Sequence, residues 1–367
     1  IYIGMEARKI QRVGRSTLSV SLPNDWAKAL GLKAGDQITF LENKDGTLTI
    51  QPLSAALETK QVEYIVNVDV CTEPGVLERI IVGNYLNGRD AIRIVSSKRI
   101  SEAHVDEIRR IVRRLLGMGI IEETSNQIFI QCSIDVTKFP ANSVIRRLYI
   151  IASTMFKEAL AALEQLNISL AKQTIVREEE ADMLYWLLTR LVFISQVDKK
   201  VAIKIGLEEP LHILGARAIG LLLERSADWG ETIARNVVEL ESYKHELETE
   251  AGKKMVSKII ELGKNVNEIC YNSIQSLYSG DILLASRAIE SYKKKVEPME
   301  EEIVNELPAQ GFSSYVCQRL RTIAWGAKRT AELGAEIAQI AINRTLESNS
   351  KYCEEHIVDE QTNHTSI

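Results

Sequence analysis

The stretch ERSADWGETIA, Glu224–Ala234, recurs in altered form as KRTAELGAEIA, Lys328–Ala338. Both copies carry an arginine, a small hydroxyl side chain, an alanine and an acid in the same order, followed by a glycine and an Ile-Ala pair. The residues before them agree at the same offset, since RAIGLLL begins at Arg217 and RTIAWGA begins at Arg321. The sequence therefore predicts a duplicated helical unit in the second half of the chain.

Helical patterning surrounds the repeat from about Asn142 to Glu347. Apolar residues return there every three or four positions over six long segments, which is typical of helices that bury one face. Loop signals interrupt the pattern at Leu207–Pro210, Ser279–Asp281 and Leu307–Gly311. Six helices fit two repeats of three, so we expect an all-α domain over 142–347 built from tandem three-helix bundles.

Acidic residues recur on these helices at the spacing of about one turn. Glu224 and Asp228 lie four residues apart in the first copy, and Glu178 and Asp182 do so on the preceding predicted helix. Carboxylate oxygens suit hard or borderline cations such as Mg²⁺, Mn²⁺ or iron. The alternative is a solvated acidic face without a ligand, because charge runs on helices are commonly surface and no histidine stands beside these acids.

The second copy offers weaker metal ligands. Glu297 and Glu301 lie four residues apart, and Glu332 takes the place of Asp228, but Lys328 stands where the first copy has Glu224. An ammonium group at that position repels a cation. We therefore expect the second metal site to be impaired or absent.

A family resemblance attaches to these residues. ERSADWGETIA resembles the ER-small-A-D signature of PhoU-type phosphate-uptake regulators, and REEEADMLYWLL, Arg177–Leu188, is similar to that family's E-x-x-x-D helix. The resemblance covers roughly residues 142–345. It implies two three-helix bundles related by pseudo-symmetry, with clusters of iron, zinc, manganese or magnesium on their acidic faces. It assigns the metal ligands Glu178, Asp182, Glu224 and Asp228 to the first cluster and, more loosely, Glu297, Glu301 and Glu332 to the second.

The segment over residues 5–53 is basic and strand-rich. LSVSLP, Leu18–Pro23, alternates apolar and polar residues as a half-buried strand does. NDWAKALGL follows as a short helix with Asn24 as its N-cap and Gly31 as its stop. Two further strands are expected around a turn at Asp45-Gly46, a strong hairpin signal. The expected order is β-β-α-β-β.

The basic residues of this segment indicate a nucleic-acid contact, because arginine neutralises phosphates and reads guanine edges. The stretch RKIQRVGRSTLSVSLPNDWAKALGLKAGD, from Arg8 onward, resembles the looped-hinge DNA-binding module of AbrB and SpoVT-type regulators. The resemblance implies an intertwined dimer, a swapped-hairpin β-barrel. So short a segment buries too little to be stable alone, which also favours a dimer. The alternative is a module that only dimerises or binds protein. The DNA-binding residues are expected to be Arg8, Lys9, Arg12, Arg15 and Ser16.

Residues 60–136 alternate strands and helices in a pattern that predicts a small α/β connector or dimerisation domain, with Ser101 capping its second helix. CTEPGVLERIIVGNYL faintly resembles the first helix of ligand-binding ACT domains, and a simple spacer is the alternative. A basic helical face in this domain contacts DNA or phosphate, or else pairs with nearby acids or a partner's acids. It consists of Arg109, Arg110, Arg113 and Arg114.

Composition limits the class of protein. The net charge is −5, so nucleic-acid binding requires a local basic patch. The sequence lacks an apolar run of the roughly 20 residues that a membrane helix needs, and it lacks a secretory layout at its start. The five cysteines form no CxxC pair, which favours a reducing cytoplasm over a disulfide framework. Phosphate-loop, dinucleotide-binding, nucleophile-elbow and zinc-protease motifs are missing, so we expect no enzymatic activity.

These observations together predict a cytoplasmic, homodimeric or larger regulator of phosphate-uptake transcription. Its N-terminal domain is expected to bind double-stranded DNA, and its helical domain is expected to sense a metal, an effector or a partner. An archaeal origin fits this domain combination, and residues 348–367 are expected to form a flexible tail. The alternative is an adaptor that binds a phosphate-transporter ATPase or a sensor kinase without touching DNA. A third interpretation is metal storage.

Overall fold

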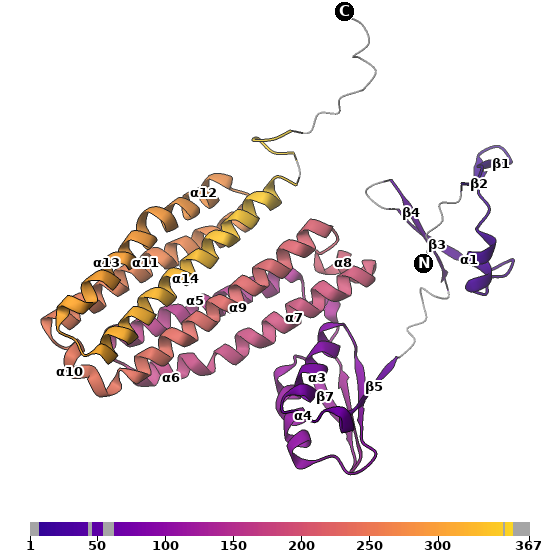
Figure 1. Ribbon diagram of the computed structural model, residues 1–367. Coiled ribbons are helices and arrows are strands. Elements are labelled where there is room, and N and C mark those ends of the chain that lie inside the picture. The colour runs from indigo at the N-terminus through magenta and orange to yellow at the C-terminus, as the bar shows by residue number, and fades with distance from the viewer. Residues whose placement is uncertain (1–6, 43–45, 54–61, 348, 355–367) are drawn as a thin grey trace, which may run out of the picture. The chain divides into compact units, whose positions relative to one another are not determined.

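The computed structural model of the chain describes residues 7–42, 46–53, 62–347 and 349–354. These residues fall into two compact units, one that ends at Val62 and one that begins at Glu63 (Figure 1). The first is strand-rich, and the second joins an α/β domain to a long helical domain.

The N-terminal unit has the predicted β-β-α-β-β order. Strand β1 (Gln11–Val13) pairs antiparallel with β2 (Thr17–Ser19), and helix α1 (Asn24–Ala29) follows. Strand β3 (Ile38–Glu42) then pairs antiparallel with β4 (Leu48–Pro52). The described strands of this unit form two separate two-stranded sheets, and the expected barrel, which involves a second chain, remains a prediction.

The ends of α1 test the cap predictions. Pro23 holds the N-cap position and Asn24 is already helical, so the prediction that Asn24 caps the helix was wrong by one residue. Proline has a φ fixed near the −57° seen here, which directs the chain into the helix without a side-chain cap. Gly31 adopts a left-handed φ of 66° directly after the C-cap residue, which confirms the predicted stop. Asp45 of the predicted turn lies outside the described residues.

The N-terminal unit has almost no interior. Among residues 7–40, 42 and 46–53, Pro52 is the only buried one. Large apolar side chains are exposed instead, including Ile10 at 68%, Leu18 at 65% and Phe40 at 61%. Because removing apolar surface from water is the main source of folding stability, this unit needs a further surface to cover these side chains.

The second unit opens with the predicted α/β domain. Its sheet has the order β5-β6-β8-β7, with β5 parallel to β6 and the other neighbours antiparallel. Helices α3 and α4 pack their apolar residues against the buried isoleucines of the sheet. The elements are β5 (Glu63–Asn67), α3 (Val76–Leu86), β6 (Ala91–Val95), α4 (Glu102–Arg114), β7 (Met118–Glu123) and β8 (Gln127–Cys132). Ser101 caps α4 as predicted, accepting a hydrogen bond from the His104 amide.

The helical domain contains the six predicted long helical segments (Figure 1). Both hydrophobic core clusters draw residues from the two repeats, so the helices form one packed body. The first repeat comprises α5 (Ala141–Gln165), α6 (Ile168–Val176) with α7 (Glu178–Val197), the short α8 (Lys199–Ile205) and α9 (Pro210–Glu239). After the one-turn helix α10 (Lys244–Leu247), the second comprises α11 (Glu250–Ser279), α12 (Ile282–Ser291) with α13 (Glu297–Glu306), and α14 (Ser314–Thr345).

The repeated stretch marks equivalent helix contacts in α9 and α14. A Cβ atom added to Gly230 would lie 3.0 Å from the Cβ atom of Met155 in α5. A Cβ atom added to Gly334 would lie 3.0 Å from the Cys270 sulfur in α11. The glycine therefore recurs because each copy brings two helices into close contact, and this part of the motif serves packing rather than chemistry.

Candidate functional site

The structure brings together the four predicted acids of the first repeat. Glu178 and Asp182 lie on the first turns of α7, and Glu224 and Asp228 lie near the middle of the neighbouring helix α9. All four side chains are partly buried. The i, i+4 spacing placed each pair on one helical face, and the packing of α7 on α9 makes the two faces meet.

Crowding of these carboxylates shows in their pKa values. Burial first, and then the charges of Asp228 and Asp182, raise the pKa of Glu224 to about 7. Burial and neighbouring acids likewise raise the pKa of Glu178 to about 7 and that of Asp228 to about 6. Each shift means that the negative form of the carboxyl is disfavoured where it stands. The four carboxyl groups therefore favour binding of a proton or a cation.

Glu231 is a fifth acid on this face that the sequence did not single out. It lies three residues after Asp228 on α9, and its charge helps to raise the pKa values of Glu178 and Asp228. Arg235, one turn further along α9, already pairs with Glu231 at 2.5 Å between Nη2 and Oε1. The three-residue spacing between Asp228 and Glu231 is the sequence feature from which Glu231 could have been predicted.

A guanidinium from the α/β domain reaches the same face. Arg114 ends helix α4, and its Nη2 atom lies 2.6 Å from Oδ2 of Asp182. Its guanidinium carbon lies 5.1 Å from the ring centre of Trp186, one turn further along α7. Two other arginines of the predicted basic face pair with Glu123 and Glu78 inside the α/β domain. The structure thus supports the acid-pairing interpretation of that face.

In the second repeat, a lysine of the repeat itself is paired with an acid of the same repeat. Lys328, which replaces Glu224, lies with Nζ 3.1 Å from Oε2 of Glu300, and Glu300 is buried. The Lys328 ammonium also lies 5.3 Å from the ring centre of Trp325. The position equivalent to Glu224 thus carries an ammonium group that is paired with a buried carboxylate.

The three acids predicted for the second cluster differ in their surroundings. Glu332 pairs with Arg329 on its own helix, and Glu301 is exposed. The charges of Glu332 and Glu297 add to burial in raising the pKa of Tyr292. A π-helical turn at Tyr292–Val296 precedes α13, on which Glu300 is buried and Glu301 is exposed.

The donor set of the first repeat has the chemistry of a hard-cation site, since it offers carboxylate oxygens and neither imidazole nor thiolate. Its side chains are not closed around an ion in this structure. Among the residues that the structure describes, no three histidine, cysteine, aspartate or glutamate side chains lie close enough to hold a metal. The predicted metal therefore stays a prediction.

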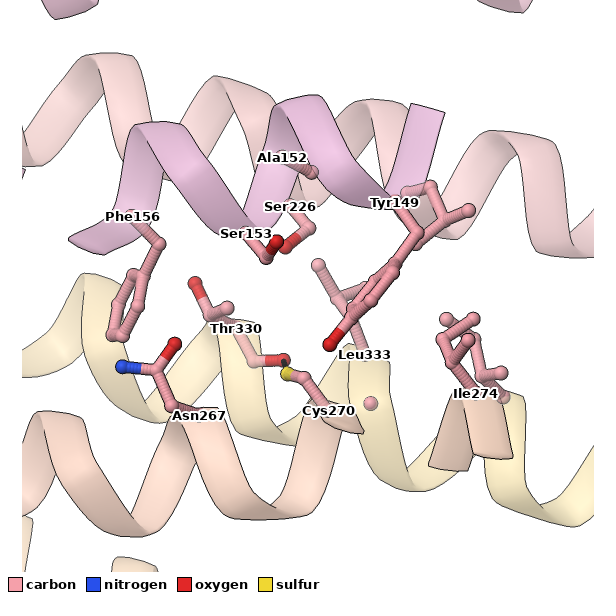
Figure 2. Close-up of a pocket in the computed structure, with 13 residues that line it drawn as sticks. Tyr149, Ala152, Ser153, Phe156, Ser226, Asn267, Cys270, Ile274, Thr330 and Leu333 are labelled. Atoms are coloured by element: carbon pink, nitrogen blue, oxygen red, sulfur yellow. Dashed lines mark hydrogen bonds between the residues drawn. The ribbon is translucent and has the colours of Figure 1, made fainter. Parts of the chain in front are cut away.

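A cavity lies between α5, α9, α11 and α14 at the junction of the two repeats (Figure 2). Figure 2 shows Ser226 and Thr330, which hold the same position in the repeated stretch, with Tyr149 of α5 and Cys270 of α11. The free volume is about 20 Å³, which accommodates about one water molecule. This size excludes the cavity as a site for an organic ligand.

Of the predicted DNA-binding residues, Arg12, Arg15 and Ser16 lie on the β1–β2 hairpin of the N-terminal unit, and Arg8 and Lys9 lie just before it. Arg12 pairs with Leu18 across the ladder, and Gly14, with a φ of 70°, turns the chain toward Arg15 and Ser16. All five predicted residues are exposed. Arg8 donates a hydrogen bond of 2.9 Å to the Ser21 hydroxyl. Lys9, Arg12 and Arg15 form no ion pair with any residue that the structure describes, so their charges face outward.

Two further features concern the surroundings of the protein. Within the described ranges, no helix is both long and apolar enough to cross a membrane. The five cysteines are free thiols, of which Cys71 and Cys132 are buried in the α/β domain.

Comparisons with known proteins locate two families on the chain. Residues 145–237 match the model of the PhoU domain, and residues 11–57 match the model described as antidote-toxin recognition MazE, bacterial antitoxin. These matches confirm the resemblances expected at the two ends, the first to PhoU and the second to MazE/AbrB-like domains. Neither matched family is an enzyme family. The PhoU match spans α5 to α9, so the second repeat lies outside it.

One solved structure with a similar arrangement is the crystal structure of PhoU from Pseudomonas aeruginosa. It is 15% identical in sequence and has a TM-score of 0.47, over 57% of this chain and 96% of that chain. Among curated proteins, none matches the chain significantly.

Proposed function

We propose that this chain is a transcriptional regulator of phosphate uptake, which binds double-stranded DNA through its N-terminal unit and senses a signal through its helical domain. The observation that carries the proposal is the basic hairpin, whose cations face outward on a unit matched by a MazE/AbrB-like model. The PhoU-domain match on the same chain supports phosphate as the regulated process. The free thiols of the chain support a cytoplasmic setting.

The hairpin supplies what a first contact with DNA needs. Phosphate neutralisation requires cations that are not already paired, and Lys9, Arg12 and Arg15 meet this condition among the described residues. Ser16 adds a hydroxyl donor at the turn, which suits a phosphate oxygen. The chain carries a net charge of −5, so DNA is attracted to this hairpin rather than to the molecule as a whole.

The helical domain supplies the sensing part. Glu178, Glu224 and Asp228 form a partly buried cluster with raised pKa values and no ion pair to a described base. A hard cation bound there would be held by these carboxylates together with Asp182, and it would add positive charge to the three that have no ion pair. We propose that occupancy of this face alters how the paired DNA-binding units engage DNA.

The DNA contact is tested with Arg12→Ala/Arg15→Ala in the full chain. Fluorescence anisotropy with a labelled random-sequence duplex, repeated over a salt series, measures affinity and its salt dependence. We expect the affinity at fixed salt to fall at least about tenfold. The slope of log affinity against log salt should become shallower by about 0.9 for each phosphate that the variant no longer neutralises.

The matched control is Lys172→Ala/Lys293→Ala, which removes the same charge from exposed positions of the helical domain. This control should bind DNA as the unchanged chain does. Equal DNA affinity of the hairpin variant and the unchanged chain would overturn the DNA-binding proposal.

A second candidate function is an adaptor that docks on a phosphate-transporter ATPase without touching DNA. The observation that favours it is a set of exposed apolar side chains near the α7–α8–α9 turns. These are Val197, Ile203, Leu211 and Leu214, exposed by 86%, 50%, 58% and 67%. Such side chains on a helical surface are typical of protein contacts. Co-purification of the ATPase with the full chain, combined with failure of the full chain to bind any duplex, would favour the adaptor.

A further inference from the structure

The sheet of the α/β domain has two edge strands, and their outer edges differ. Among the described strands, β5 pairs with β6 alone and β7 pairs with β8 alone. An edge strand presents unpaired backbone N–H and C=O groups, which accept a further strand unless something blocks the edge. The residues along each edge therefore indicate whether it can take a partner.

The β7 edge carries two features that block pairing. Its ladder with β8 has a register shift between Ile120 and Glu122, and the strand ends on two glutamates, Glu122 and Glu123. A bulge bends the strand away from a straight partner, and charged side chains oppose the approach of another strand. This edge is protected.

The β5 edge lacks such features. Its pairing with β6 runs without a register shift, and Ile65 at its centre is 71% exposed. Val62 and Val70, which lie just before and just after the strand region, are 54% and 69% exposed. The one charged residue of β5, Glu63, forms an ion pair with Arg93 on β6. The strand is thus a regular edge that leaves apolar side chains in water.

We propose that β5 pairs antiparallel with β5 of a second copy of this chain, centred on Ile65, so that the two sheets join into one continuous sheet. The inference rests on the paired DNA-binding units of the proposed function, and it names the strand through which the α/β domains of the two copies meet.

The order of residues in β5 suits this pairing. Alternation places Glu63, Ile65 and Asn67 on one face, and Tyr64 and Val66 on the face that packs against the helices. A two-fold axis perpendicular to the sheet at Ile65 sets each Ile65 opposite its own copy and each Glu63 opposite an Asn67. The exposed isoleucine is then covered by an isoleucine, and no like charges stand opposite each other. Any other centre leaves part of the strand unpaired.

This contact is too small to hold two chains together by itself. A pair of five-residue strands buries far less than the roughly 1,000 Å² of a stable interface. Only residues 53–62 separate β4 from β5, so two chains joined through their N-terminal units hold their β5 strands at a high effective concentration. The strand pair then fixes the separation of the two chains at the point where they leave the DNA-binding units.

The test is disulfide cross-linking of the full chain with Ile65→Cys, in a Cys353→Ser background because Cys353 is the exposed native thiol. Residues directly opposite across an antiparallel pair have Cα atoms about 4.5–5.5 Å apart, which a disulfide spans. Ile121→Cys, at a 54% exposed position of the protected β7 edge, is the matched control. We expect Ile65→Cys to form linked dimers at least about tenfold faster than Ile121→Cys, as their different effective concentrations require.

The register is tested by co-expressing Glu63→Cys chains with Asn67→Cys chains in the same background. Antiparallel pairing about Ile65 predicts links between the two kinds of chain, and neither kind should link to itself. Self-linking of Glu63→Cys would show a parallel pair and would contradict the proposed register.

Hydrogen exchange gives a second readout that needs no cross-link. The amides of residues 63–67 should be protected in the unchanged chain, and Ile65→Lys, which sets two ammonium groups opposite each other, should speed their exchange at least about tenfold. The mass of the dimer should not change in this variant. Protected β5 amides together with Ile65→Cys cross-linking no faster than Ile121→Cys would mean that another segment covers the strand, and would overturn the pairing.

DNA binding of the same proteins separates this inference from the proposed function. A dimer that binds DNA but cross-links no faster through Ile65→Cys than through Ile121→Cys would leave the regulator standing and remove the strand pairing. Fast cross-linking through Ile65→Cys in a chain that ignores DNA would support the pairing and remove the regulator.

Discussion

Glu224 is the residue at which charge crowding in the first repeat can be measured most directly. Its carboxyl has a pKa of about 7 in the folded chain, against the ordinary value of 4.5, because burial and three neighbouring acids disfavour its charge. The folded chain therefore holds this proton more tightly than the unfolded chain does. The associated stability is complete below about pH 4.5 and is lost as the pH rises through about 7.

Glu224→Gln replaces the carboxyl with a neutral amide of the same shape. At about pH 8 we expect the free energy of unfolding to rise by about 1 kcal/mol, a value reduced for partial exposure, and its decline above about pH 5 to become shallower. Urea unfolding at a series of pH values measures both effects. Glu164→Gln, at an exposed position of α5, is the control and should keep the original profile. A lower stability of Glu224→Gln at about pH 8 would contradict the crowding.

For single residues, the sequence predicts features that depend on neighbours within a few positions along the chain. The four acids of the first repeat could be named because their spacing lies within one helical turn and the repeat marks their place. Arg114 was noticed as one of a basic run, but its partner Asp182 lies on another domain and is set by the packing of α4 on α7. The burial of Glu300 next to the predicted ligand Glu301 could not be predicted from the i, i+4 spacing alone.

Helix α9 offers a test of packing with its control on the same element. Gly230→Ala places a methyl group 3.0 Å from the Met155 Cβ atom and 3.3 Å from the Phe156 backbone nitrogen, so α5 and α9 must separate. We expect the free energy of unfolding to fall by about 1–3 kcal/mol, the usual cost of overpacking. Thermal unfolding followed by circular dichroism measures the change.

Gly215→Ala is the matched substitution on α9, because its methyl group meets Ile340 at an ordinary 3.6 Å. Alanine favours a helix over glycine by about 0.8–1.0 kcal/mol, so this variant should be as stable as the original chain or more stable. Equal destabilisation by both substitutions would contradict the explanation that the glycine recurs because α5 and α9 pack closely at Gly230.

Among the elements, long amphipathic helices were the most predictable, since a pattern repeated over many turns outweighs local noise. Strand β7 could not be predicted from alternation, because its residues, MGIIEE, do not alternate between apolar and polar. The pairing of β7 with β8 has a register shift between Ile120 and Glu122. This irregularity breaks the alternation of the two faces, and it could not be predicted from the sequence pattern. The expected domain bounds, 5–53, 60–136 and 142–347, remain predictions.

At the scale of the whole molecule, the two units obtain their stability differently. The second unit has two large hydrophobic clusters in its helices and another in its α/β domain. The first unit buries only Pro52 among residues 7–40, 42 and 46–53, and it leaves Ile10, Leu18 and Phe40 exposed. Fewer than about 50 residues without an interior do not form a stable domain alone. A second copy of the same unit is the simplest cover.

The chain should therefore be a dimer whose contact lies in its first unit. Light scattering after size exclusion should give twice the chain mass of 41.2 kDa. Phe40→Glu places a charge on this apolar surface and should yield monomers, while Ile150→Glu, at a 52% exposed position of α5, should leave the dimer intact. DNA affinity should fall with the dimer, since two-fold symmetry doubles the basic hairpins that one duplex meets. A dimer that survives Phe40→Glu but is absent in Ile150→Glu would instead place the contact on the helical domain.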